Sequence, residues 1–267
     1  FFVADMDMIF KANFIEKLYH YKNEREVHYF QVGFLSEEES KKKIDFSDYK
    51  VNFLSTEAAT GMTLYPTDLL EKINGYNEFY HGWGAEDTDV HVRIAKLKLP
   101  VIFHQEEVLI LHQWHAKNYR SKSSKEPFHS QLEKINHHYL IQTKKDNTTQ
   151  ANLKFDWGKI PEISSYDSLE NPDSIVNLSN EVNDIEAFLS SLNEKKGVFQ
   201  INIERSDKQQ STRNRIKNAL KKHKKKYYLM DEINDKLLLL IVSNFRNQPY
   251  QYVFSQMDEK IALKISL

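Results

Sequence analysis

Cysteine is absent from this sequence of 267 residues. Its absence excludes disulfide bonds, thiolate metal sites and cysteine nucleophiles, and it fits a reducing compartment. No apolar run approaches the ~20 residues of a membrane-spanning helix, and the longest, Leu237 to Val242, has the length of a strand. Neither a signal peptide nor an internal repeat is visible. The formal net charge of −1 argues against a general nucleic-acid binder.

The composition is that of an ordinary globular protein, with 40% hydrophobic and 28% charged residues. The length allows one large domain or two ordinary ones. Between Lys144 and Ser174 the residues Asn, Asp, Ser and Pro dominate, which predicts a boundary in this stretch. We therefore expect an α/β catalytic region at residues 1–148 and a small α+β domain of unknown role at residues 149–267.

Hydrophobic periodicity and turn residues predict the main elements. Residues 36–48 are a charged stretch that predicts a solvated loop or short helix. Strands are predicted at residues 1–10, 27–35, 60–65, 101–103, 108–111, 198–203, 237–242, 250–255 and 261–267. Helices are predicted at residues 11–21, from Pro66 to the Asn74-Gly75 cap, from Asp87 to Leu97, and at residues 130–142, 182–192 and 209–222.

Asp5-Met6-Asp7 is the first of three segments with candidate chemistry. In an extended segment, side chains two residues apart point to the same face, so both carboxylates would be presented together. Paired carboxylates suit a hard divalent cation, which in turn can hold a nucleotide diphosphate. The same spacing also arises by chance on many protein surfaces, and a plain acidic surface is the alternative.

The second segment runs from Gly82 through Trp83 and Gly84 to Glu86 and Asp87. Glycines let the backbone turn tightly and approach a ligand, and the indole offers a flat face for a sugar ring. The two carboxylates precede a predicted helix, where one of them can simply stabilise the helix dipole. A carboxylate here is equally well placed as a general base, because the helix terminus would favour its ionised form.

The third segment is His112-Gln113-Trp114-His115, at the end of an apolar strand. Two histidines at this spacing can converge on one metal ion if the chain turns between them. An incidental pair of surface histidines is the alternative.

Taken in order, the three segments resemble the β-1,4-galactosyltransferase-like family of GT-A glycosyltransferases. Polypeptide N-acetylgalactosaminyltransferases and bacterial chain-elongating transferases share similar pieces. The most specific part is Ile73-Asn74-Gly75-Tyr76 leading into the stretch from Gly82 to Asp89, and the resemblance covers about residues 1–140. It implies the C-terminal half of a GT-A fold that moves a sugar from a UDP-sugar to an acceptor hydroxyl.

The resemblance also implies a metal centre. Asp7 would bind the ion directly, with Asp5 nearer the nucleotide or sugar, while His115 and His112 would be the second and third protein ligands. The matching position of His112 can be Met in the galactosyltransferases, so this sequence departs toward a harder nitrogen ligand. The implied metal is Mn²⁺, with Mg²⁺ as the alternative.

The resemblance further implies catalytic roles. Asp87 would be the base, Glu86 would orient sugar hydroxyls, and Trp83 and Gly84 would line the donor and acceptor sites. Family members of this type invert the anomeric centre by direct displacement, in which the base deprotonates the acceptor and the metal stabilises the departing diphosphate.

The sequence departs from the family at its start. A complete GT-A fold begins with a nucleotide-binding α/β half before the Asp-x-Asp strand, and no such segment precedes Asp5. The resemblance therefore predicts weak or absent turnover by this chain alone, and normal turnover would refute that prediction.

Two other functions are compatible with the three segments. A catalytically silent carbohydrate-binding or scaffold module would keep the fold, dispense with Asp87 and bind its ligand without metal. A metal-dependent phosphoesterase would hydrolyse a nucleotide-sugar without an acceptor, although the further carboxylates of a two-metal site are lacking.

A basic stretch at residues 213–226 lies outside these segments. Such a run is ordinarily a solvated face; otherwise it would contact an anionic glycan, a partner protein or, peripherally, an anionic membrane surface. We expect a cytoplasmic protein, located at the inner face of the membrane under the last reading. The abundance of Lys, Asn and Ile is typical of a bacterial source and predicts a role in surface-polysaccharide synthesis.

Overall fold

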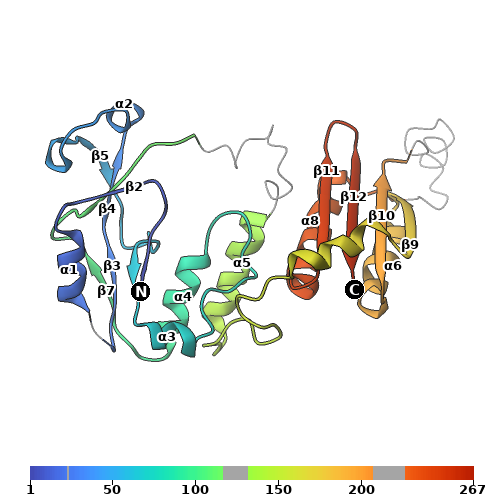
Figure 1. The fold of residues 1–267 in the computed structure, drawn as a ribbon, viewed down its shortest axis with the longest axis horizontal. Coiled ribbons are helices and arrows are strands. Elements are labelled where there is room, and N and C mark those ends of the chain that lie inside the picture. The colour runs from blue at the N-terminus through green and yellow to red at the C-terminus, as the bar shows by residue number, and fades with distance from the viewer. Residues whose placement is uncertain (23, 117–131, 207–225) are drawn as a thin grey trace. The chain divides into compact units, whose positions relative to one another are not determined.

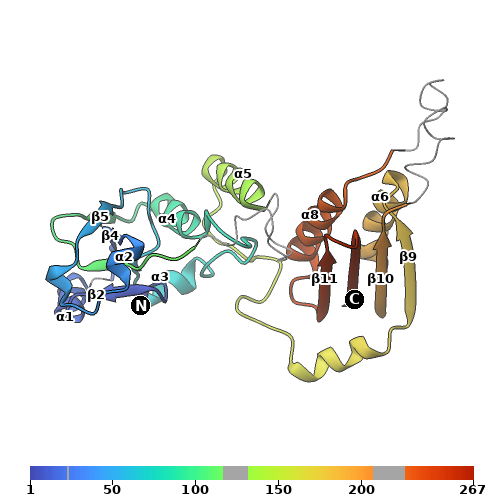
Figure 2. The same cartoon turned by 90° about the horizontal axis from the view of Figure 1, so that it is seen from above.

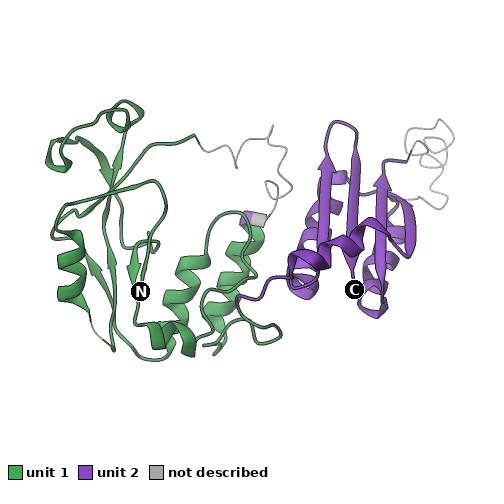
Figure 3. Ribbon diagram, in the orientation of Figure 1, with its two compact units in different colours: residues 1–118, 134–157 green, residues 119–133, 158–267 purple. Residues whose placement is uncertain are grey.

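The computed structural model describes residues 1–22, 24–116, 132–206 and 226–267, which form two compact units (Figures 1 and 3). Among these residues, unit 1 comprises 1–22, 24–116 and 134–157, and unit 2 comprises 132–133, 158–206 and 226–267. The predicted α/β class is confirmed, since helices accompany three mixed four-stranded sheets. No helix within the described ranges is long and apolar enough to cross a membrane.

Unit 1 is built on two mixed sheets between which the chain passes repeatedly. The first has the order β1 (Phe2–Val3), β6 (Thr63–Leu64), β3 (Val27–Phe30) and β7 (Val101–His104). The second has the order β2 (Met8–Phe10), β8 (Ile110–His112), β4 (Val32–Leu35) and β5 (Val51–Leu54). The segment predicted as one strand at residues 27–35 is thus two strands in different sheets.

The helices of unit 1 bury apolar positions at helical spacing. In α1 (Phe14–Tyr21), Phe14 and Leu18 are buried beside Phe30 and Ile110. In α4 (Glu86–Lys96), Val90 and Ile94 pack in a second cluster with α3 (Thr67–Lys72). The remaining helices of this unit within the described residues are α2 (Glu37–Ser40), the 3₁₀ turn Phe46–Asp48 and α5 (Leu132–Lys145).

The segment at residues 150–157 packs on the turn that follows α3. The Asn152 side-chain amide donates to the carbonyls of Asn74 and Tyr76, and Asn74 donates to the Ala151 carbonyl. A Cβ at Gly75 would lie 2.0 Å from the Trp157 ring, so only glycine fits beneath this indole. The structure therefore divides after Trp157, beyond the predicted boundary at residue 148, because these contacts belong to unit 1.

Unit 2 is a four-stranded sheet with two α-helices on one face and a 3₁₀ helix on the other (Figure 2). Its core lies between the sheet and the two α-helices, where Ile201, Ile203, Ile185 and Ile233 are fully buried. The strands have the order β11 (Tyr250–Ser255), β12 (Lys260–Ser266), β10 (Val198–Glu204) and β9 (Ser174–Ser179). The helices are α6 (Val182–Ser191) and α8 (Met230–Leu240), with 3₁₀ segments at Ile163–Glu170 and Leu192–Glu194.

One predicted strand of unit 2 is wrong. Residues 237–242 end α8 and enter a π-helical turn, Ile241–Phe245, instead of forming a strand. The helical period already begins at Ile233, which is buried with Leu237 and Ile241 four and eight residues later. Strands β5 and β9 were not predicted. The predicted helix at 209–222 and nearly all of the basic stretch at 213–226 lie outside the described residues.

Candidate active site

Asp7, His112 and His115 bring three donor groups together in unit 1. The Nε2 atoms of both histidines lie 3.3 Å from Oδ2 of Asp7, and one donor atom from each residue lies within 4.8 Å of the other two. Donors around one small divalent ion stand about 3 Å apart, because metal–donor bonds are about 2.0–2.2 Å long. The carboxylate and imidazole donors therefore fit one cation, whereas the same contacts without metal would be an Asp–His ion pair.

Strand pairing explains why residues far apart in the sequence meet here. Strands β2 and β8 are antiparallel with Met8 opposite His112, so Asp7 lies beside the end of β8. The backbone N–H of Gln113 donates to the Asp7 carbonyl at 3.0 Å and its side-chain amide donates to the same oxygen at 3.3 Å. Three residues after His112, His115 also reaches the Asp7 carboxylate, although no regular turn lies between the two histidines.

The acidic pair does not lie on an extended strand, which corrects that prediction. Met6 and Asp7 form a turn between β1 and β2, which belong to different sheets. Asp5 still belongs to the site electrostatically. Its pKa is raised by desolvation and by Asp7, and lowered by His112 and His115.

Asp87 lies in the first turn of α4, at the end of the glycine-rich loop. Gly82 and Gly84 have φ values of 72° and 95°, and Ala85, the residue before the helix, has φ 80°, a left-handed conformation that is rare for alanine. The Asn136 amide of α5 donates to the carbonyls of His81 and Trp83 and so holds the loop from the other side. Backbone strain of this kind is common at functional sites.

The Asp87 carboxyl is set apart by its environment. Desolvation, followed by the neighbouring Glu86, raises its pKa from 3.8 to about 7, while a hydrogen bond from the Tyr76 phenol opposes the shift and Asp5 adds to it. We expected the helix terminus to favour the ionised form, but burial outweighs it. A carboxylate with a pKa near neutrality has the value that suits a general base. The interaction with Asp5 connects the Asp87 carboxyl to the cluster of Asp7, His112 and His115.

Gly61 and Trp83 border this carboxyl and its loop. A Cβ at Gly61 would lie 3.2 Å from Oδ2 of Asp87, so a larger residue would crowd the carboxylate. Trp83 is 48% exposed. Glu86 lies beside Asp87, and a Cβ at Gly84 would meet nothing within 4 Å. The structure therefore places all of the predicted site residues in unit 1.

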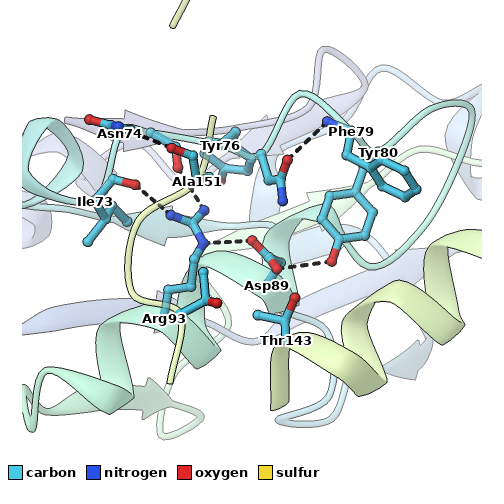
Figure 4. A network of polar contacts seen from close by, with 12 residues as sticks. Ile73, Asn74, Tyr76, Phe79, Tyr80, Asp89, Arg93, Thr143 and Ala151 are labelled. Carbon is cyan, nitrogen blue, oxygen red and sulfur yellow. Dashed lines mark hydrogen bonds and ion pairs between the residues drawn. The ribbon is translucent and has the colours of Figure 1, made fainter. Parts of the chain in front are cut away.

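A buried ion pair supports the loop and was not predicted from the sequence (Figure 4). Arg93 and Asp89 of α4, with 1% and 0% of their side chains exposed, pair at 2.7 Å. The guanidinium also donates to the carbonyls of Ile73 and Gly75, at 2.8 and 2.7 Å, and the Tyr80 hydroxyl donates to Asp89 at 3.0 Å. Arg93 thus links the turn that contains Tyr76 with the helix that contains Asp87. The signal in the sequence was the Asp–Arg spacing of four residues within a predicted helix.

Replacing Tyr76 with Phe is expected to raise the pKa of Asp87 above 7, because the variant loses the phenol that stabilises the carboxylate. A hydrogen bond to a charged group is worth about 1.5–3 kcal/mol, or about one to two pKa units. NMR of the labelled carboxyl carbon measures the pKa directly. Tyr65→Phe is the control, because the Tyr65 hydroxyl lies 3.4 Å from that of Tyr76 and should affect Asp87 less. An unchanged pKa in Tyr76→Phe would contradict this role.

The fold and the site of unit 1 agree with the class of protein that the sequence resembles. Unit 1 combines mixed α/β sheets, a carboxylate–imidazole donor cluster and a carboxyl poised near neutrality, as expected of a glycosyltransferase. Residues 41–115 match the family model described as the N-terminal domain of galactosyltransferase. This match confirms the galactosyltransferase-like resemblance and includes Trp83, Asp87 and both histidines. No curated protein and no solved structure matches the chain.

Proposed function

We propose that this protein is a metal-dependent glycosyltransferase that moves a sugar from a UDP-sugar to an acceptor hydroxyl with inversion at the anomeric carbon. The observation that supports it best is the geometry of one site: Asp7, His112 and His115 converge within metal-binding distance, and Asp87 is coupled to them through Asp5. The galactosyltransferase match over residues 41–115 supports the same reaction class.

The metal site would be held by Asp7, His112 and His115. A divalent cation there, Mn²⁺ in our proposal and Mg²⁺ as the alternative, supplies positive charge that stabilises a departing diphosphate. Asp5 would interact with the nucleotide or sugar of the donor. Its pKa is raised first by desolvation and second by the negative charge of Asp7, and a bound cation would lower it.

Asp87 would act as the base. Its carboxylate accepts the proton of the acceptor hydroxyl as the acceptor oxygen bonds to the anomeric carbon and the bond from that carbon to the diphosphate breaks. Tyr76 keeps part of the Asp87 population ionised near neutral pH. Glu86 would orient acceptor hydroxyls, while Trp83 and Gly84 line the sugar-binding region.

A transfer assay tests this function. The chain is incubated with Mn²⁺, a panel of UDP-hexoses and UDP-N-acetylhexosamines, and a panel of sugar acceptors, and both UDP release and the glycosylated product are measured. Where the coding sequence continues upstream, the longer protein is assayed in parallel. The proposal predicts UDP release that requires an acceptor and is lost with a chelator or in Asp87→Asn. Release without an acceptor would identify a hydrolase, and ligand binding with no turnover in either form would identify a silent binding module.

A further inference from the structure

The segment between His112 and His115 is held from outside the proposed metal site by Ser40. The Ser40 hydroxyl accepts the Trp114 backbone N–H at 2.7 Å, across 74 positions of the sequence. The same hydroxyl donates its proton to the Ser36 carbonyl at 2.9 Å. Because a serine hydroxyl has one proton, this donation turns its lone pairs toward Trp114. Ser40 therefore constrains the backbone between the two histidines.

Helix α2, which carries Ser40, is itself well anchored despite its four residues. Its first turn is capped by Ser36, whose hydroxyl accepts the Glu39 N–H at 3.2 Å. The Glu39 carboxylate accepts the Lys50 N–H at 3.2 Å and pairs with Lys42. The helix that carries the Ser40 hydroxyl is thus hydrogen-bonded, through Glu39, to Lys50, which immediately precedes β5.

Phe34 constrains the His112 imidazole in a second way. Phe34 and His112 are register partners on the parallel strands β4 and β8, and their rings stack at 4.6 Å with an angle of 26°. On its other side the Phe34 ring stacks on Phe53 at 4.6 Å and 7°. The imidazole therefore lies against a ring that is already held in place, with its Nε2 directed at Asp7.

We propose that Ser40 and Phe34 are positioning residues that prearrange the two histidine donors for a divalent cation. Ser40 acts on the backbone between the two histidines, and Phe34 acts on the His112 ring. This inference rests on the metal site of the proposed function. Residues that orient metal ligands from outside the ligand set commonly change affinity by 10–100-fold when mutated. Because the contact of Ser40 with Trp114 is exposed to solvent, water can replace it in the variant, so folding stability should change little.

The test is isothermal titration of Mn²⁺ into the full chain and its variants, with thermal unfolding measured on the same samples. Ser40→Ala is expected to bind Mn²⁺ about tenfold more weakly with a nearly unchanged melting temperature. Ser40→Thr keeps the hydroxyl and should restore the affinity. Ser55→Ala is the matched control, since Ser55 also accepts a backbone N–H, that of Val32 at 2.9 Å, but away from the histidines. It should lose stability and keep its affinity.

The aromatic pair gives a second comparison. Phe34→Leu should weaken Mn²⁺ binding, and Phe53→Leu, which removes a ring stacked on Phe34 but not on His112, should weaken it less. If wild type binds Mn²⁺ and the Ser40→Ala and Phe34→Leu variants bind it equally well, the positioning role is wrong and the metal site stands. If wild type does not bind Mn²⁺, the metal site itself is wrong, and the two failures are thereby distinguished.

Discussion

Replacement of Asp87 by Asn is expected to lower sugar transfer by about 10²–10⁴-fold, the usual contribution of a general base. Asn keeps the shape of the side chain but cannot accept the acceptor's proton. The measurement is the turnover rate, in the form of the protein that transfers sugar, at saturating donor and acceptor. Glu86→Gln is the matched control, because Glu86 is the neighbouring carboxylate in the same helical turn and is expected to affect acceptor KM more than turnover.

The pH dependence of the wild-type rate follows from the same carboxyl. With a pKa of about 7, Asp87 is protonated below that pH and cannot act as a base. The rate should therefore rise with pH through neutrality, and a bound cation should move this limb to lower pH by stabilising the negative charge. A rate independent of pH from acid to neutral conditions would exclude Asp87 as the base.

The ionised Asp87 carboxylate also lowers the stability of the folded state, and the Asn variant should reveal this effect. Because the pKa of this acid is raised on folding from 3.8 to about 7, the folded state binds more protons than the unfolded state between those values. Its destabilising effect is absent below the unfolded pKa, grows as the pH rises and is complete above about 7. Asp87→Asn should therefore raise the melting temperature at alkaline pH and leave it nearly unchanged at acid pH. The opposite dependence would show that the carboxylate is stabilised by folding.

Replacement of Arg93 by Met is expected to destabilise unit 1 by about 3–5 kcal/mol, the usual result of breaking a buried ion pair. The variant leaves the fully buried Asp89 carboxylate without its cation. It also removes the guanidinium N–H groups that donate to the backbone carbonyls of Ile73 and Gly75. Urea unfolding measures the loss. Arg93→Lys should recover only part of it, because an ammonium cannot reproduce the fork of the guanidinium.

The double variant Asp89→Asn with Arg93→Met separates charge from packing. Asn keeps an acceptor for the Tyr80 hydroxyl but carries no charge, so the unpaired buried carboxylate is gone. We expect the double variant to be more stable than Arg93→Met alone. If the stability lost by the double variant equals the sum of the losses of Asp89→Asn and Arg93→Met, the two side chains are not coupled. The network in Figure 4 would then not have the role assigned to it.

The residue types of the site could be predicted from the sequence, but part of its geometry could not. The three segments are recognisable by order and content, and the His112–His115 spacing predicted convergence if the chain turned. Placement of Asp5 and Asp7 on an extended strand failed, because the chain changes sheets between β1 and β2 and such a crossing leaves no periodic signal. The raised pKa of Asp87 depends on burial by distant residues and was likewise not predictable.

The same limit applies to the fold. Amphipathic helices such as α1, α4 and α6 follow from apolar spacing alone. The run from Leu237 to Val242 is apolar on all sides, and periodicity cannot distinguish a buried helix from a strand in such a run. The segment that ends at Trp157 has the composition of a linker. Its fit over Gly75 depends on a backbone conformation, with φ 61°, that is formed 82 residues earlier in the chain.

Titration of Mn²⁺ into wild type, Asp7→Ala and His115→Ala, with and without UDP, tests the central claim most directly. The account predicts that wild type binds one ion, that both variants lose it, and that UDP strengthens binding wherever the donor site is present. Retention of wild-type affinity by both variants, or no binding by wild type in either condition, would contradict the claim that these segments form one metal centre.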